Sequence, residues 1–252
     1  MGTILDIQNV RMDFGNLHAL DGISFEVDEK SVTILIGPNG SGKTTLINVA
    51  TGLYKPNAGK IVYQGNDVTG LEPFKIYRLG LVRTFQIPAL FAKLAVLENV
   101  MVAKKDHPGE AFSKSFLKSS WTRAEQDTAE EAFRIIQSLG LIDIWDQPAS
   151  TLSGGQMKLL EIARALMSGA KTMLLDEPIS GVNPTLAHDI FRRILKLRDE
   201  RGLTFLIVEH RLDIALSYVD TVVAMAYGKL LISGKPEPVM SDRRLIDAYL
   251  GG

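Results

Sequence analysis

The chain opens with short segments in which hydrophobic and polar residues alternate. Within 23–28, isoleucine, phenylalanine and valine alternate with serine, glutamate and aspartate, and 5–7 and 61–63 resemble this segment. A period of two is typical of a strand with one buried face. These segments predict a small antiparallel β-sheet.

Three later segments are continuously apolar, and they cover 32–36, 172–175 and 204–208. Such runs are typical of strands that are buried on both faces, as in a parallel sheet. A turn and a helical pattern follow each run, which predicts an α/β core with a mainly parallel sheet.

The middle of the chain has a helical period instead. Hydrophobic residues recur at helical spacing between 129 and 139, and Thr122 with Glu125 forms a possible capping box before them. We find no convincing strand between about 88 and 147. The pattern predicts that 1–87 and 166–252 form the α/β core with its antiparallel subdomain, and that 88–165 form an inserted helical subdomain.

Composition narrows the class of protein. The 252 residues include 28 Lys and Arg against 29 Asp and Glu, and the net charge is −1. This balance argues against a broadly basic nucleic-acid binder, so we expect no nucleic-acid partner. There are no cysteines, which excludes a disulfide scaffold and a thiolate metal site. No apolar run reaches the roughly 18 residues that a membrane-spanning helix needs.

A glycine-rich segment follows the apolar run 32–36. It matches the Walker A pattern in full and has the sequence Gly37-Pro38-Asn39-Gly40-Ser41-Gly42-Lys43-Thr44, followed by Thr45 and a helical run. Glycines let backbone amides approach phosphate oxygens, and the helix N-terminus favours negative charge. Lys43 is placed to contact the β- and γ-phosphates, and the Thr44 hydroxyl to ligate Mg²⁺. The segment predicts binding of a nucleotide such as ATP.

An acidic pair, Asp176-Glu177, ends the apolar run that begins at Thr172. Parallel α/β sheets place ligands at the carboxyl ends of their strands. Asp176 suits a Mg²⁺ contact, and Glu177 suits orienting or deprotonating an attacking water. A solvated strand end would have the same composition, but the phosphate loop upstream favours the catalytic interpretation.

A second glycine-rich turn precedes the helical pattern of 158–167. It has the sequence Leu152-Ser153-Gly154-Gly155-Gln156. Ser153 and Gln156 have the spacing of a capping box, yet two glycines are poor formers of a first helical turn. Their use suggests close approach of another group, and the bare amides form a second anion site. Because one nucleotide does not need two such sites, we infer a dimer in which each ATP lies between Lys43 of one subunit and Ser153 of the other.

Together with Val208-Glu209-His210, these motifs resemble those of ABC-type ATPases over the whole chain. The resemblance implies a P-loop ABC ATPase fold in which 88–165 carries the signature motif. It implies that Phe14 stacks on adenine, that Gln86 senses Mg²⁺ and the lytic water, and that His210 contacts the γ-phosphate. Asn183 stands where the family usually has an aspartate, which removes a charge from that loop.

Softer similarities point to a subfamily. Four stretches, 80–86, 90–91, 97–100 and 160–166, and the ending Ala248-Tyr249-Leu250-Gly251 resemble the ATPases of branched-chain (hydrophobic) amino-acid importers. The resemblance implies an ATP-hydrolysing subunit on the cytoplasmic face of the membrane. It would pair with itself or a paralogous ATPase and drive a separate transmembrane permease, docked near Gln86 and 87–91.

Two alternatives remain open at this point. One is an importer ATPase for another small solute, such as urea or a short amide. The other is a soluble ABC ATPase without a transport role, a class whose long heptad coiled coils are missing from this sequence.

Overall fold

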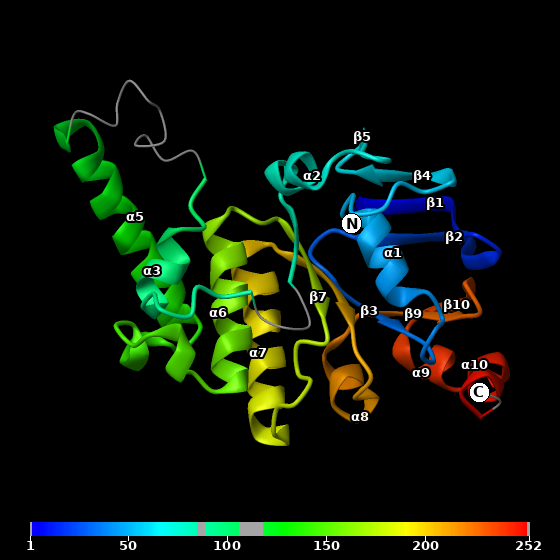
Figure 1. Cartoon of the computed structure of the whole chain (residues 1–252). Helices are drawn as coiled ribbons and strands as arrows, with labels where there is room; N and C mark the ends of the chain where they lie inside the picture. The colour runs from blue at the N-terminus through cyan, green and yellow to red at the C-terminus, as the bar shows by residue number, and fades with distance from the viewer. Residues whose placement is uncertain (1, 85–88, 106–117, 251–252) are drawn as a thin grey trace. The chain divides into compact units, whose positions relative to one another are not determined.

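A computed structural model describes residues 2–84, 89–105 and 118–250, with backbone alone for 118–121 and 250 (Figure 1). The chain divides into two compact units. The first contains Met1–Gln86, Lys171–Ser180 and Pro184–Gly252, and the second contains Ile87–Ala170 and Gly181–Asn183. Each unit is described by itself.

The first unit contains a six-stranded sheet in the order β10-β9-β3-β8-β7-β6. Neighbouring strands run parallel except β10, which is antiparallel to β9. Every residue of β3, β7 and β8 is buried, as their continuous apolar sequences predict. The strands are β3 (Val32–Ile36), β6 (Leu81–Arg83), β7 (Thr172–Asp176), β8 (Thr204–Val208), β9 (Thr221–Ala226) and β10 (Lys229–Gly234).

A second, four-stranded sheet is antiparallel and has the order β2-β1-β4-β5. In β2 the side chains of Ile23, Phe25 and Val27 are buried and the residues after each of them are exposed, which confirms the alternating pattern. The strands are β1 (Thr3–Phe14), β2 (Leu17–Asp28), β4 (Ala58–Tyr63) and β5 (Asn66–Asp67). The predicted fold class, a mainly parallel α/β sheet with a small antiparallel one, is confirmed.

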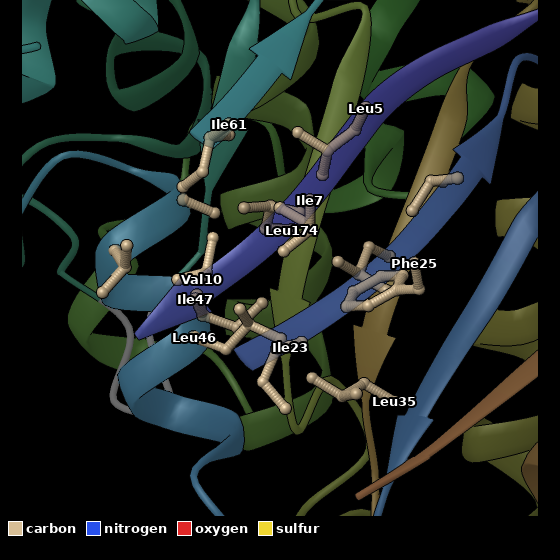
Figure 2. Packing of buried hydrophobic residues seen from close by; sticks show 14 of the residues in the cluster. Leu5, Ile7, Val10, Ile23, Phe25, Leu35, Leu46, Ile47, Ile61 and Leu174 are labelled. Atoms are coloured by element: carbon tan, nitrogen blue, oxygen red, sulfur yellow. The ribbon is translucent and has the colours of Figure 1, made fainter. Parts of the chain in front are cut away.

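One hydrophobic core joins the two sheets to helix α1 (Lys43–Ala50). Figure 2 shows Leu46 and Ile47 of α1 among side chains of β1 and β2, including Val10 and Ile23. Leu174 of β7 belongs to the same cluster. Truncating such a buried aliphatic side chain typically costs about 2–5 kcal/mol, so this core fixes the start of α1 firmly relative to both sheets.

The remaining helices of the first unit pack against the six-stranded sheet or link its strands. Helix α7 buries Ala187, Ile190, Phe191, Ile194 and Leu197, one face at helical spacing, and contacts β8. The helices are α2 (Pro73–Leu79), α7 (Pro184–Arg201), α8 (Leu212–Ala215), the 3₁₀ turn η4 (Leu216–Tyr218), α9 (Pro236–Met240) and α10 (Arg243–Leu250).

The second unit, over its described residues, is helical and contains no strand. Its elements are α3 (Val96–Met101), α5 (Lys118–Ser138), η2 (Ile142–Ile144), η3 (Ala149–Thr151) and α6 (Gly154–Met167). Asn99 is fully buried in this unit. Its side-chain Nδ2 donates to the carbonyl oxygens of Phe91, Leu94 and Ala95. This anchor was not predicted.

One local prediction was wrong. Thr122 lies inside α5, four residues after the helix begins, and does not cap it. Capping residues are a preference only, and threonine and glutamate are also tolerated within helices. Over the described residues, no helix is both long enough and apolar enough to cross a bilayer.

Candidate active site

The phosphate loop runs from the end of β3 to the start of α1 and depends on its glycines. Gly42 has φ 100°, and a Cβ there would lie 2.5 Å from the carbonyl oxygen of Ala19. A Cβ on Gly37 would lie 2.1 Å from the carbonyl oxygen of Met225. No other residue fits these two positions without moving the backbone.

Lys43, the first residue of α1, is buried within this loop. Its Nζ donates hydrogen bonds to the carbonyl oxygens of Gly37 at 2.9 Å and Pro38 at 3.0 Å. Burial lowers the pKa of Lys43 from its usual value, and the nearby charges of Glu177 and Asp176 act in the opposite direction. Lys43 and the N-terminus of α1 lie together at this loop, which favours an anionic ligand.

A cavity of about 580 Å³ opens beside the loop. The cavity is lined by residues from the β1–β2 turn, the loop, the carboxyl ends of β7 and β8, and the β9–β10 turn: Phe14, Leu17, His18, Ala19, 39–45, Glu177, Val208, His210, Tyr227 and Gly228. The structure thus brings Phe14, most of the phosphate loop, Glu177 and His210 to one place. Phe14 is 44% exposed, and its ring contacts Tyr54 edge-on, with ring centroids 5.4 Å apart.

Tyr227 is a lining residue that the sequence reasoning missed. It is 71% exposed and has a left-handed φ of 51° at the turn between β9 and β10. The available signal was Gly228 after an apolar run, because glycine marks turns.

Asp176 is the last residue of β7 and is buried. Its Oδ2 accepts a hydrogen bond from Nη2 of Arg83 at 2.8 Å, and the guanidinium of Arg83 also donates to the side chain of Asn48 on α1. The side chains of this ion pair are only 9% and 8% exposed. The pair connects the carboxylate to the helix that follows the phosphate loop, and it was not predicted.

Glu177 comes directly after β7 in a strained conformation, with φ 50°. Its N–H donates to the carbonyl oxygen of Val208 at 2.9 Å, which fixes it beside the end of β8. Oε1 of Glu177 lies 3.3 Å from Nε2 of His210. Strained backbone that is held by its surroundings is concentrated at functional sites.

Gln86, the remaining catalytic candidate, lies outside the described residues. Among the residues that are described, no group of three or more His, Cys, Asp or Glu side chains has the geometry to hold a metal ion.

The second glycine-rich turn lies in the second unit, at the start of α6. Ser153 is the N-cap: its hydroxyl accepts from the N–H of Gln156 at 3.4 Å, and its own N–H donates to Oε1 of Gln156 at 2.8 Å. The predicted capping box is confirmed. Ser153 and Gly154 are exposed, Gly155 is buried, and a Cβ on Gly154 would meet no atom within 4 Å.

Fold and site together define a P-loop nucleotide-binding protein. The family model for ABC transporters matches residues 20–180. A probable branched-chain amino acid transport ATP-binding protein, LivG, from Archaeoglobus fulgidus is 46% identical over 98% of this chain and 95% of its own length. A high-affinity branched-chain amino acid transport ATP-binding protein, BraF, from Pseudomonas aeruginosa is 38% identical over 98% of both chains.

A solved structure of the ADP conformation of an ATP-binding cassette from an ABC transporter is 44% identical over 100% of both chains, with a TM-score of 0.87. The chain therefore belongs to the ABC transporter family and is an ATP-binding subunit with ATPase activity. The resemblance seen in the sequence is confirmed.

Proposed function

We propose that this chain is the ATP-hydrolysing subunit of an importer for branched-chain, hydrophobic amino acids, in which two ATPase subunits close around two Mg-ATP and drive a separate permease. The cavity in which the phosphate loop, Glu177 and His210 meet is the observation that carries the hydrolytic part. The cargo rests on the two relatives named for branched-chain amino acid transport.

Each group in the cavity has a proposed binding role. Backbone N–H groups from Gly37 to Thr45, except at Pro38, which has none, bind the phosphates together with Nζ of Lys43, and Phe14 stacks on adenine. Thr44 and Asp176, with Gln86, would hold Mg²⁺ together with phosphate oxygens and water. Mg²⁺ fits this donor set because it typically takes one or two protein oxygens plus substrate phosphates, so a three-residue protein cluster is not required. When bound, Mg²⁺ neutralises charge that develops on the phosphates.

Glu177 and His210 act on the water that attacks the γ-phosphorus. Glu177 accepts its proton as the new P–O bond forms and the bond to the ADP oxygen breaks. His210, whose Nε2 lies 3.3 Å from Oε1 of Glu177, orients that carboxylate and donates to a γ-phosphate oxygen.

The turn at Ser153 supports the dimer. None of the residues that the structure describes requires a glycine at 154, because a Cβ there would meet none of their atoms within 4 Å. A glycine is nevertheless present, next to an exposed serine and the bare amides of a helix start. Close approach by the γ-phosphate of an ATP held on another subunit, identical or paralogous, accounts for it.

The permease is proposed to dock where hydrophobic side chains are exposed. In the first unit, Leu53, Tyr54 and Phe74 are 48%, 38% and 56% exposed. Leu53 also lines a mostly apolar cavity of about 240 Å³, together with Pro73, Tyr77, Val82 and others. In the second unit Phe91 is 47% exposed. Docking on such patches would place the chain on the cytoplasmic face of the membrane.

Copurification tests the transport role. The tagged chain is isolated from detergent-solubilised native membranes, and its partners are identified by mass spectrometry. We expect two polytopic membrane proteins, with or without a sister ATPase. Recovery with soluble proteins only would refute the transport role and favour the soluble ABC ATPase.

Uptake measurements test the cargo. Deleting the gene should abolish high-affinity uptake of labelled leucine, and wild-type chain should restore it while Lys43→Ala does not. Uptake of urea serves as the control for the alternative cargo. Loss of urea uptake with intact leucine uptake would contradict the proposal.

A further inference from the structure

Glu209 is a buried carboxylate that none of the roles above uses. It follows β8, directly before His210, and is only 2% exposed. Burial raises the pKa of its carboxyl, and backbone hydrogen bonds oppose this rise. A buried carboxylate is costly unless its oxygens are hydrogen-bonded, so its partners indicate what it is kept for.

The two oxygens of Glu209 contact two different loops. Oε1 accepts the N–H of Ile179, two residues after Glu177, at 2.9 Å. Oε2 accepts the N–H groups of His210 at 3.0 Å and Arg211 at 3.3 Å. The carboxylate therefore joins the loop that carries Glu177 to the loop that carries His210.

These bonds close a ring around the catalytic pair. From Glu177 the chain runs through Pro178 to Ile179, whose N–H reaches Glu209, and Glu209 is bonded to His210. The ring closes where Nε2 of His210 lies 3.3 Å from Oε1 of Glu177. Ile179 is fully buried, so the loop cannot follow a shift of Glu209 without exposing or repacking that side chain.

We propose that Glu209 is a positioning residue for hydrolysis, which holds Glu177 and His210 in register by accepting backbone hydrogen bonds from both of their loops. The inference rests on the proposed roles of Glu177 and His210. A carboxylate suits the position because it accepts at both ends, whereas an amide has one oxygen and one donor group. In Glu209→Gln, one of the two loops faces an NH₂ group and loses its bond.

The test is a double-mutant cycle on the full-length chain. ATP turnover is measured for wild type, Glu209→Gln, His210→Ala and the double variant, by single-turnover release of phosphate where rates are low. We expect Glu209→Gln to lower kcat about 10- to 100-fold, because misplacement of catalytic groups by about 1 Å has effects of that size. The KM and Kd for ATP should stay within about twofold, since the phosphate loop is not touched.

In the His210→Ala background, the same change should lower kcat by a clearly smaller factor than in wild type, because one of the two groups that Glu209 positions is gone. Equal factors in both backgrounds would overturn the proposal, and so would a loss of ATP affinity that accounts for the rate. A wild-type rate in His210→Ala alone would instead refute the proposed role of His210. Glu209→Asp, which keeps the charge but shortens the reach, enters the same cycle if the glutamine variant does not fold.

Asp220 offers a matched control. Its Oδ2 also accepts a backbone N–H, that of Val32 at 2.8 Å, but at the opposite end of β3 from the phosphate loop. Asp220→Asn weakens this bond and also removes the ion pair of Asp220 with Arg198 at 3.0 Å, and it should leave kcat within about twofold of wild type. A drop equal to that of Glu209→Gln would show that any such loss slows the enzyme, and would overturn the positioning role.

Discussion

Two glycine-rich turns precede helices in this chain, and their glycines serve different contacts. In the phosphate loop, Gly37 and Gly42 touch backbone oxygens of the chain itself, at distances that no Cβ tolerates. In the turn before α6, the space beside Gly154 is open. The first turn thus requires its glycines for the chain's own fold, whereas no described residue near the second turn accounts for Gly154. Variants at the two turns should separate stability from activity.

The largest effect on stability is expected at Arg83, which connects Asp176 to the helix that follows the phosphate loop. Replacing it with methionine leaves the buried Asp176 without its cation, and removing one partner of such a pair costs about 3–5 kcal/mol. Urea unfolding measures this cost. The control is Lys196→Met, whose exposed pair with Glu200 at 3.8 Å should contribute at most about 1 kcal/mol. Equal losses would contradict the structural importance of Asp176–Arg83.

Gly42→Ala comes next. The φ of 100° and the contact with the carbonyl of Ala19 strain an alanine there, with an expected cost of about 1–3 kcal/mol. Distortion of the loop should also weaken ATP binding at least about tenfold, since its amides no longer converge on the phosphates. Calorimetric titration with ATP checks this result. Wild-type affinity would contradict the assignment of the loop.

Ser153→Ala tests the cap of α6. Losing the capping box costs about 1 kcal/mol, because the N–H of Gln156 loses its side-chain acceptor. Binding of ATP to the isolated subunit should not change, whereas turnover should fall. If affinity and turnover fall together, Ser153 is contributing to the subunit's own nucleotide site instead of a partner's.

Gly154→Ala should change stability by less than about 0.5 kcal/mol, because the new methyl group meets no atom of the described residues within 4 Å. It should nevertheless lower turnover at least about tenfold and prevent the ATP-dependent dimer, measured by light scattering in the Glu177→Gln background. Wild-type turnover and dimerisation in this variant would remove the main structural support for the shared site.

The smallest effect concerns pH. The pKa of Lys43 is lowered by burial, so between this lowered value and the usual value of roughly 10.4 the unfolded chain binds more protons than the folded one. The contribution of Lys43 therefore makes stability rise with pH between these two values. Lys43→Met should remove this part of the slope, whereas Ser153→Ala should leave it unchanged, since the turn 153–156 has no titratable group.

Most of the local elements in these two regions were predictable. The apolar run 32–36, the glycines after it and the capping spacing of Ser153 and Gln156 are all local patterns, and each has the expected structure. The strands β6, β9 and β10 were not assigned. A run such as 221–226 is equally apolar in a buried helix or strand, and its pairing with β3 decides between them.

Within the candidate site, the predictable part was the type of residue at each motif position. The roles of these residues, and the domain boundaries, remain predictions. The unpredicted contacts join residues far apart in sequence: Arg83 with Asp176, and Glu209 with Ile179. No local pattern distinguishes a buried arginine or glutamate of this kind from a solvated one, because charged residues near strand ends are common on protein surfaces.

The sequence by itself therefore determined the chemistry that is available: a phosphate loop, an acidic pair, a histidine after β8 and a second glycine-rich helix start. Each of these features is a short pattern of neighbouring residues, and such patterns can be recognised without knowing the fold. The tertiary structure alone decided that Asp176 has the cation of Arg83 beside it and that Glu209 accepts from backbone N–H groups. It also decided that Gly37 and Gly42 are packed against backbone oxygens of the chain. Those outcomes depend on burial and on partners that the fold brings from distant segments, because burial determines the cost of a charge and of an added Cβ.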